Sequence, residues 1–174
     1  MISLGCAKNL VDAEIMLGSL LKSGAEITND PATADAVIVN TCSFIDAAQE
    51  ESVDAILDSA AVREANQRGQ ALIVSGCLSQ RFREELPKLL PEVDAFMGID
   101  QVAQVGELVR DAMARRQAKV QSPKSKAPSP KSKVTKALAA LDKAKADTHD
   151  VDESLRGTDK FGRSEEHTSE LQSH

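Results

Sequence analysis

The sequence is poor in aromatic side chains: it has no tryptophan, no tyrosine and only four phenylalanines among 174 residues. A flavin site commonly stacks aromatic rings on the cofactor, and this scarcity therefore counts against a flavin-binding domain. No run of about 18 apolar residues occurs, so we expect no membrane-spanning helix and no membrane partner. No charged leader followed by an apolar stretch precedes the first expected strand, which favours a cytoplasmic protein over a secreted one.

Histidine is absent from residues 1–148, because all three histidines, His149, His167 and His174, lie near the end of the sequence. This absence removes a cysteine–histidine nucleophilic pair from that part of the chain. It also leaves a structural zinc site without its usual fourth ligand. Neither GxGxxG nor GxxxxGK(S/T) occurs, so the common dinucleotide and nucleotide loops are missing as well.

Charge divides the chain into three regions. Residues 1–114 carry 18 acidic and 8 basic side chains, a net charge of −10. Residues 115–146 carry 1 acidic and 10 basic side chains, a net charge of +9, and residues 147–174 carry 8 acidic and 3 basic ones, a net charge of −5. The first region is long enough to bury a hydrophobic core, and we predict that residues 1–114 form one domain.

The rest of the chain has the composition of a linker and a tail. SPKSK occurs twice, at residues 122–126 and 129–133, and we interpret residues 115–162 as a disordered linker or insertion. Its lysines are more simply explained as keeping the linker solvated and extended than as an RNA-binding site, which is the alternative. Residues 134–146 could form a short basic helix. Residues 163–174, RSEEHTSELQSH, resemble the translation of a sequencing-library adapter and are excluded from fold reasoning.

Three apolar stretches, each followed by a small or polar turn and then a cysteine, organise residues 1–114. They are ISLG before Cys6, VIVN and Thr41 before Cys42, and LIVSG before Cys77. Uncharged apolar runs of this length are typical of buried strands in a parallel sheet. Because parallel strands point the same way, we expect all three thiols at the carboxyl edge of the sheet, where such sheets bind ligands.

Helical periodicity separates these strands. We expect further strands at residues 25–28 and 93–98, and helices at residues 9–22, 45–68, 78–85 and about 100–116, with Asp100 capping the last. Pro87 and Pro91 are expected to bound a loop. The alternation predicts an α/β fold with an open parallel sheet of about five strands and helices on both faces, followed by the disordered Lys/Pro/Ser-rich tail.

The three cysteines point to metal or redox chemistry. An odd number of cysteines without an export signal argues against a disulfide framework. The alternative without a functional site is that all three cysteines are buried and act as small hydrophobic side chains. We disfavour it because all three follow strand ends. An iron–sulfur cluster fits better, since thiolates are its usual ligands. Three thiolates would leave one iron open to an exogenous ligand. The polar residues near the cysteines are Asn40, Thr41 and Gln80. They could form ordinary turns and helix starts, or they could donate hydrogen bonds to the cluster ligands, and the sequence favours neither role.

Four motifs resemble the amino-terminal domain of the methylthiotransferases, which are radical-SAM enzymes that insert a methylthio group at an unactivated C–H bond. They are SLGCAKNLVDAE at residues 3–14, VNTCSFIDAAQEES at 39–52, SGCLSQR at 75–81 and PEVDAFMG at 91–98. The similarity covers about residues 2–110. It is closest to the branch that modifies an aspartate side chain of a small-subunit ribosomal protein. The tRNA-modifying branch typically differs after the second cysteine, where this chain has Ser43-Phe44-Ile45.

The resemblance implies a role for each cysteine and a set of cofactors. Cys6, Cys42 and Cys77 would bind an auxiliary 4Fe-4S cluster, although the family usually has Pro at Ala7 and Gly at Ser43. The sequence contains no CxxxCxxC motif for the second 4Fe-4S cluster and S-adenosyl-L-methionine, so no catalytic residue is expected here and the chain alone should be inactive. The implied partner is the ribosomal protein. The alternatives are a tRNA adenosine methylthiotransferase and a stand-alone iron–sulfur module for electron transfer.

Overall fold

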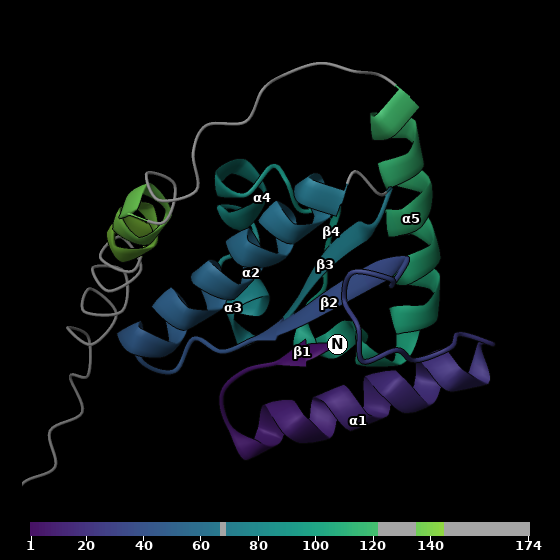
Figure 1. Cartoon of the computed structure of the whole chain (residues 1–174). Coiled ribbons are helices and arrows are strands. Elements are labelled where there is room, and N and C mark those ends of the chain that lie inside the picture. The colour runs from purple at the N-terminus through teal and green to yellow at the C-terminus, as the bar shows by residue number, and fades with distance from the viewer. Residues whose placement is uncertain (67–68, 122–134, 145–174) are drawn as a thin grey trace, which may run out of the picture.

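The computed structural model describes residues 1–66, 69–121 and 135–144, and shows an α/β fold around a parallel sheet (Figure 1). Within these residues the sheet has four strands in the order β1-β2-β3-β4. Their bounds are Ile2–Ser3 for β1, Ala36–Thr41 for β2, Ala71–Gly76 for β3 and Ala95–Phe96 for β4. The predicted fold class and the parallel arrangement are confirmed.

β2 and β3 form the centre of the sheet. They pair in parallel over their whole length, from Ala36 opposite Ala71 to Thr41 opposite Gly76. β1 pairs with the carboxyl half of β2, while β4 pairs with the middle of β3. Almost every residue of the two central strands is buried, which explains why their sequences are continuous apolar runs rather than alternating ones.

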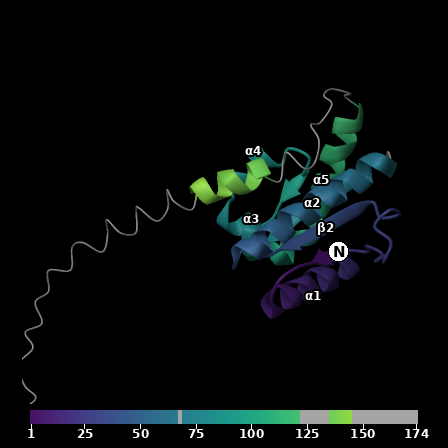
Figure 2. The ribbon, with the colours of Figure 1, turned by 60° about the vertical axis from the view of Figure 1, so that its left-hand side comes forward.

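Helices cover both faces of the sheet, as predicted. They are α1 (Ala7–Lys22), α2 (Asp46–Asn66), α3 (Cys77–Arg81), α4 (Leu86–Leu89), the 3₁₀ helix η1 (Ile99–Gln104) and α5 (Val105–Gln121). Val37 and Val39 of β2 contribute to a core with α2, α3 and α4. Ile38, which points the other way, packs in a second core with α1 and α5. Figures 1 and 2 show α2 on one side of the sheet and α1 and α5 on the other.

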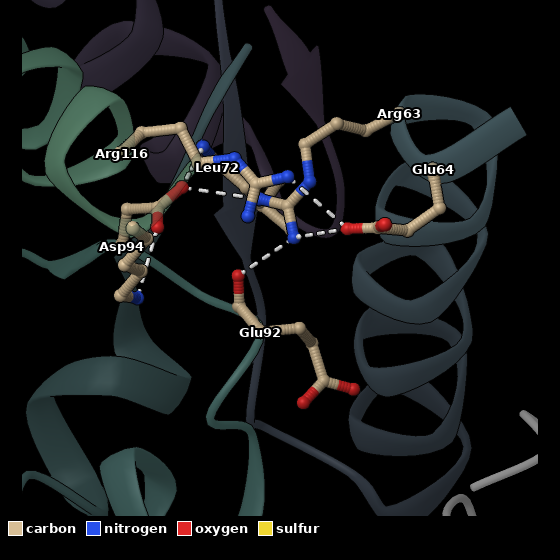
Figure 3. Close-up of polar contacts among 7 residues, drawn as sticks. Arg63, Glu64, Leu72, Glu92, Asp94 and Arg116 are labelled. Carbon is tan, nitrogen blue, oxygen red and sulfur yellow. Dashed lines mark hydrogen bonds and ion pairs between the residues drawn. The ribbon is translucent and has the colours of Figure 1, made fainter. Parts of the chain in front are cut away.

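A buried ion pair ties three elements together at the end of the sheet where β3 and β4 begin (Figure 3). Arg63 Nη1 of α2 lies 3.0 Å from Asp94 Oδ2, and both side chains are almost completely buried. The same carboxylate oxygen accepts a hydrogen bond from Leu72 N at 3.0 Å, and Asp94 Oδ1 accepts one from Lys119 of α5 at 3.0 Å. Burial lowers the pKa of Arg63, and the charge of Asp94 opposes that shift.

Three predicted elements differ from the structure. Residues 25–28 form no strand, because this stretch is exposed and buries no side chain that would hold it to the sheet. The predicted helix at 78–85 ends early, and α4 follows where a loop was expected. Pro87 sits in the first turn of α4, where its missing N–H costs no hydrogen bond. Asp100 lies inside η1 rather than at its cap, and pairs with Arg83 at 3.0 Å.

Parts of the predicted linker are helical. Residues 115–121 continue α5, and residues 135–144 form a helix inside the predicted basic helix at 134–146. The interpretation as a linker and tail implies that residues 117–174 pack little against the domain. For this helix the expectation is wrong, because Ala137 and Leu141 are buried in the core that contains α2. Both SPKSK repeats and residues 145–174 lie outside the described residues, so their disorder and the adapter-like tail stay predictions.

Candidate functional site

The three cysteines follow the carboxyl ends of three neighbouring strands. Cys6 precedes α1 as its N-terminal cap residue, Cys42 comes directly after β2, and Cys77 is the first residue of α3 after β3. The parallel register sets the strand ends side by side, with Ser3 opposite Asn40 and Thr41 opposite Gly76. All three residues therefore lie at the ligand-binding edge of the sheet.

The three thiols are free but differ in exposure: Cys6 is exposed, Cys77 is half-buried and Cys42 is buried. Gly5 brings the first two segments together. It has a φ of +94°, and a Cβ at this position would clash with the Cβ of Cys42 and lie 2.8 Å from its Sγ. Only glycine adopts this conformation and allows this approach without strain.

Gly76 makes the corresponding close approach between β3 and β2. Its φ is +98°, and a Cβ there would clash with the carbonyl oxygen of Thr41 and lie 2.7 Å from Asn40 Oδ1. This amide oxygen is buried and has no hydrogen-bond partner among the residues that the structure describes. The backbone at Cys77 is thus set tightly against the end of the strand that carries Cys42.

Asn9 links all three strand ends and was missed by sequence reasoning. Its fully buried side chain donates hydrogen bonds to the carbonyl oxygens of Leu4 and Thr41, each at 2.8 Å. Its Oδ1 accepts a hydrogen bond from Cys77 Sγ at 3.7 Å. A signal was present in the sequence, because Asn9 falls on the same helical stripe as the buried residues Ala13, Met16 and Leu20.

The loop after β2 is fixed by Ser52 of α2, which sequence reasoning also missed. Ser52 Oγ accepts a hydrogen bond from Cys42 N at 3.1 Å and donates to Ala48 O at 2.7 Å. Of the polar neighbours considered above, Thr41 donates to Ser75 O and Asn40 donates to Asn9 O at 2.7 Å. Gln80 instead accepts a hydrogen bond from Ile99 N at 3.2 Å, away from the cysteines.

The electrostatics of the thiols differ. Hydrogen bonds from the backbone N–H groups of Asn9 and Lys8 lower the pKa of Cys6. Burial raises the pKa of Cys77; the Lys8 ammonium opposes this shift, while Cys42 and Cys6 add to it. Cys6 and Cys42 therefore both lie within electrostatic reach of the Cys77 thiol.

Comparison with known proteins places the domain in a family. Residues 1–98 match the model described as "Uncharacterized protein family UPF0004". The chain belongs to this family. It is also similar to curated proteins named "Ribosomal protein uS12 methylthiotransferase RimO". The protein from Akkermansia muciniphila is 57% identical over 117 residues, which cover 66% of this chain and 26% of the relative.

Two further curated proteins with the same name are similar to this chain over nearly the same length. The one from Geobacter sulfurreducens is 53% identical over 115 residues, covering 66% of this chain and 26% of the relative. The one from Trichlorobacter lovleyi is 56% identical over 111 residues, covering 64% and 24%. The chain thus spans about a quarter of the length of the curated relatives it matches. The resemblance to a RimO-type methylthiotransferase amino-terminal domain is confirmed.

The donor set of this UPF0004 domain suits thiolate ligation of a cluster. No group of three or more His, Cys, Asp or Glu side chains in the described residues is arranged to hold a metal ion. A 4Fe-4S cluster makes a different demand, because each thiolate binds a separate iron and the ligands therefore stand further apart than around one ion.

The described helices include none that is long and apolar enough to cross a membrane.

Proposed function

We propose that this chain is the cluster-binding amino-terminal domain of a methylthiotransferase that modifies an aspartate of the small-subunit ribosomal protein uS12. Cys6, Cys42 and Cys77 would hold one auxiliary 4Fe-4S cluster. The observation that carries the proposal is the position of three free cysteines at the ends of β1, β2 and β3. The high identity to proteins named for uS12 methylthiolation supports the choice of substrate.

The chemistry of the bound group follows from the number of its protein ligands. A 4Fe-4S cluster normally takes four thiolates, and one held by three has an open iron at which the sulfur to be transferred can bind. The rest of the whole protein would hold the second 4Fe-4S cluster and S-adenosyl-L-methionine. We place the whole enzyme in the cytoplasm, where its ribosomal substrate is made.

The chain's own residues would set the geometry of the ligands. Asn9 joins the ends of β1 and β2 and contacts the Cys77 thiol. Ser52 fixes the backbone at Cys42. Gly5 lets the first strand end touch Cys42. Such rigid support is what a preorganised ligand set requires.

A domain exchange tests this function. We would replace the aligned region of the Akkermansia muciniphila relative with the matching 117 residues of this chain, and express the chimera in a strain without its own uS12 methylthiotransferase. We expect uS12 to gain a methylthio group, detected by mass spectrometry. The chimera with Cys42→Ala should leave uS12 unmodified. Modification of tRNA adenosine instead of uS12, or full activity of the Cys42→Ala chimera, would contradict the proposal.

A further inference from the structure

The helix at residues 135–144 covers a surface formed by α2, α3 and α4. Figures 1 and 2 show it outside this layer, on the side away from the sheet. Leu141 is fully buried and Ala137 is 2% exposed, in one core with Val53 and Ile56 of α2. The helix thus shields apolar side chains of α2 and its neighbours from water.

The helix has a narrow apolar face. Ala137, Leu138, Leu141 and Ala144 are buried or partly buried and pack with the core, and their spacing of one, three and three residues places them on one side of the helix. Lys136, Ala139 and Lys143 are exposed on the other side. Asp142 is exposed as well, so the segment is a short amphipathic helix whose outer face carries a small positive charge.

This helix is too short to be stable alone. It contains ten residues, whereas isolated helices shorter than about 12 to 15 residues are marginal in water. Its alanines, leucines and lysines have high helix propensity, so little free energy is needed to complete it once one face is covered. Its helical state thus depends on its contact with the domain.

The charges of the two partners are complementary. Residues 1–114 carry a net charge of −10, whereas the docked helix, with Lys136, Asp142 and Lys143, carries +1. Glu50, Asp54 and Asp58 are exposed on α2. The small positive charge of the helix favours association only weakly, so the apolar face determines where the helix docks.

We propose that the outer surface of α2, α3 and α4 is a docking site for a short amphipathic helix, and that residues 135–144 are its occupant and fold only when docked. The occupant is a segment of the same chain, tethered through α5. Because α2 follows Cys42 and α3 begins at Cys77, docking stabilises the layer from which two of the cysteines are held. The inference does not depend on the chemistry of the cysteines.

Hydrogen–deuterium exchange of the full chain with two matched substitutions tests the inference. Ala137→Asp puts a carboxylate into the buried contact, and Ala139→Asp puts the same group on the exposed side of the same helix. We expect Ala137→Asp to abolish amide protection at residues 138–144 and to leave β3 protected. Ala139→Asp should keep protection in both.

Two outcomes of this exchange experiment would overturn the inference. Equal protection of residues 138–144 in the two variants would show that the contact does not maintain the helix. Loss of protection in β3 together with residues 138–144 in Ala137→Asp would show that the helix is an integral part of the core and not a docked segment.

A peptide experiment tests the docking site itself. A tethered segment acts at an effective concentration on the order of millimolar, so we would titrate the Ala137→Asp chain with a peptide of residues 134–146 to that concentration. We expect NMR shifts at the amides of α2. A peptide that carries Ala137→Asp should cause none. Absence of shifts with the unchanged peptide, or equal shifts with both, would contradict a specific helix-docking site.

Discussion

At the scale of single residues, Asn9 holds the strand ends that carry the cysteines. Its side-chain amide donates to two carbonyl groups of different segments, those of Leu4 and Thr41. A buried polar group that loses its partner pays its full desolvation cost. The geometry of the cysteine edge therefore depends on this one amide.

Replacing Asn9 with alanine should lower the free energy of unfolding by about 1 to 3 kcal/mol, because two carbonyl groups lose their donor. Denaturant unfolding measures this change. Asn29→Ala is the control, since Asn29 is exposed in a loop and its loss should change stability by less than about 0.5 kcal/mol. Equal effects of the two substitutions would remove Asn9 from this role.

The cysteines should differ in reactivity in the reduced, metal-free chain. A lowered pKa gives Cys6 more thiolate at any pH near neutrality, whereas Cys77 has a raised pKa and Cys42 is buried. We expect iodoacetamide to modify Cys6 first, with a rate that rises with pH and levels off at a lower pH than for Cys77. Peptide mass spectrometry over a pH series reports both, and faster labelling of Cys42 would contradict the geometry.

At the scale of elements, the Arg63–Asp94 pair (Figure 3) joins α2 to the residue before β4. Lys119 of α5 also pairs with Asp94. The pair lies at the opposite end of the sheet from the cysteines. Each of the two charges offsets the cost of burying the other, because either charge left unpaired in this position would destabilise the fold.

Asp94→Asn should therefore lower the free energy of unfolding by about 3 to 5 kcal/mol, the usual effect of leaving a buried charge unpaired. Asp58→Asn, which removes an exposed charge from α2, serves as the matched control. Chemical denaturation of both variants gives the comparison. A loss no larger than that of the control would mean that the pair contributes nothing to holding α2 against β4.

The elements that were predictable are those whose pattern is dictated by burial. β2 and β3 are continuous apolar runs because both their faces are covered. The sequence does not predict α4, because Pro87 favours a loop boundary as well as the first turn of a helix, where it lies. Residues 25–28, AEIT, were expected to form a strand, but all four are exposed and none is buried against the sheet.

At the scale of the whole molecule, the placement of the cysteines at one edge follows from parallel topology and could be predicted before any coordinates. The polar residues that support them were predictable only in part. Asn9 lies on the buried stripe of α1, but periodicity reveals neither its hydrogen bond to Thr41 nor that of Ser52 to Cys42. The helix at residues 135–144 lies within the basic helix expected at 134–146, but its packing against the domain could not be predicted. Its composition indicates a linker, and only its packing shows the contact.

The central claim is that Cys6, Cys42 and Cys77 together hold one iron–sulfur cluster, and anaerobic reconstitution with iron and sulfide tests it most directly. We predict that the chain binds about four iron atoms as one 4Fe-4S cluster, counted by iron analysis and identified by Mössbauer spectroscopy. Each single cysteine-to-alanine variant should lose most of this iron, because two thiolates do not hold the cluster stably. Iron content near zero in the unchanged chain, or full loading of any alanine variant, would contradict the shared site.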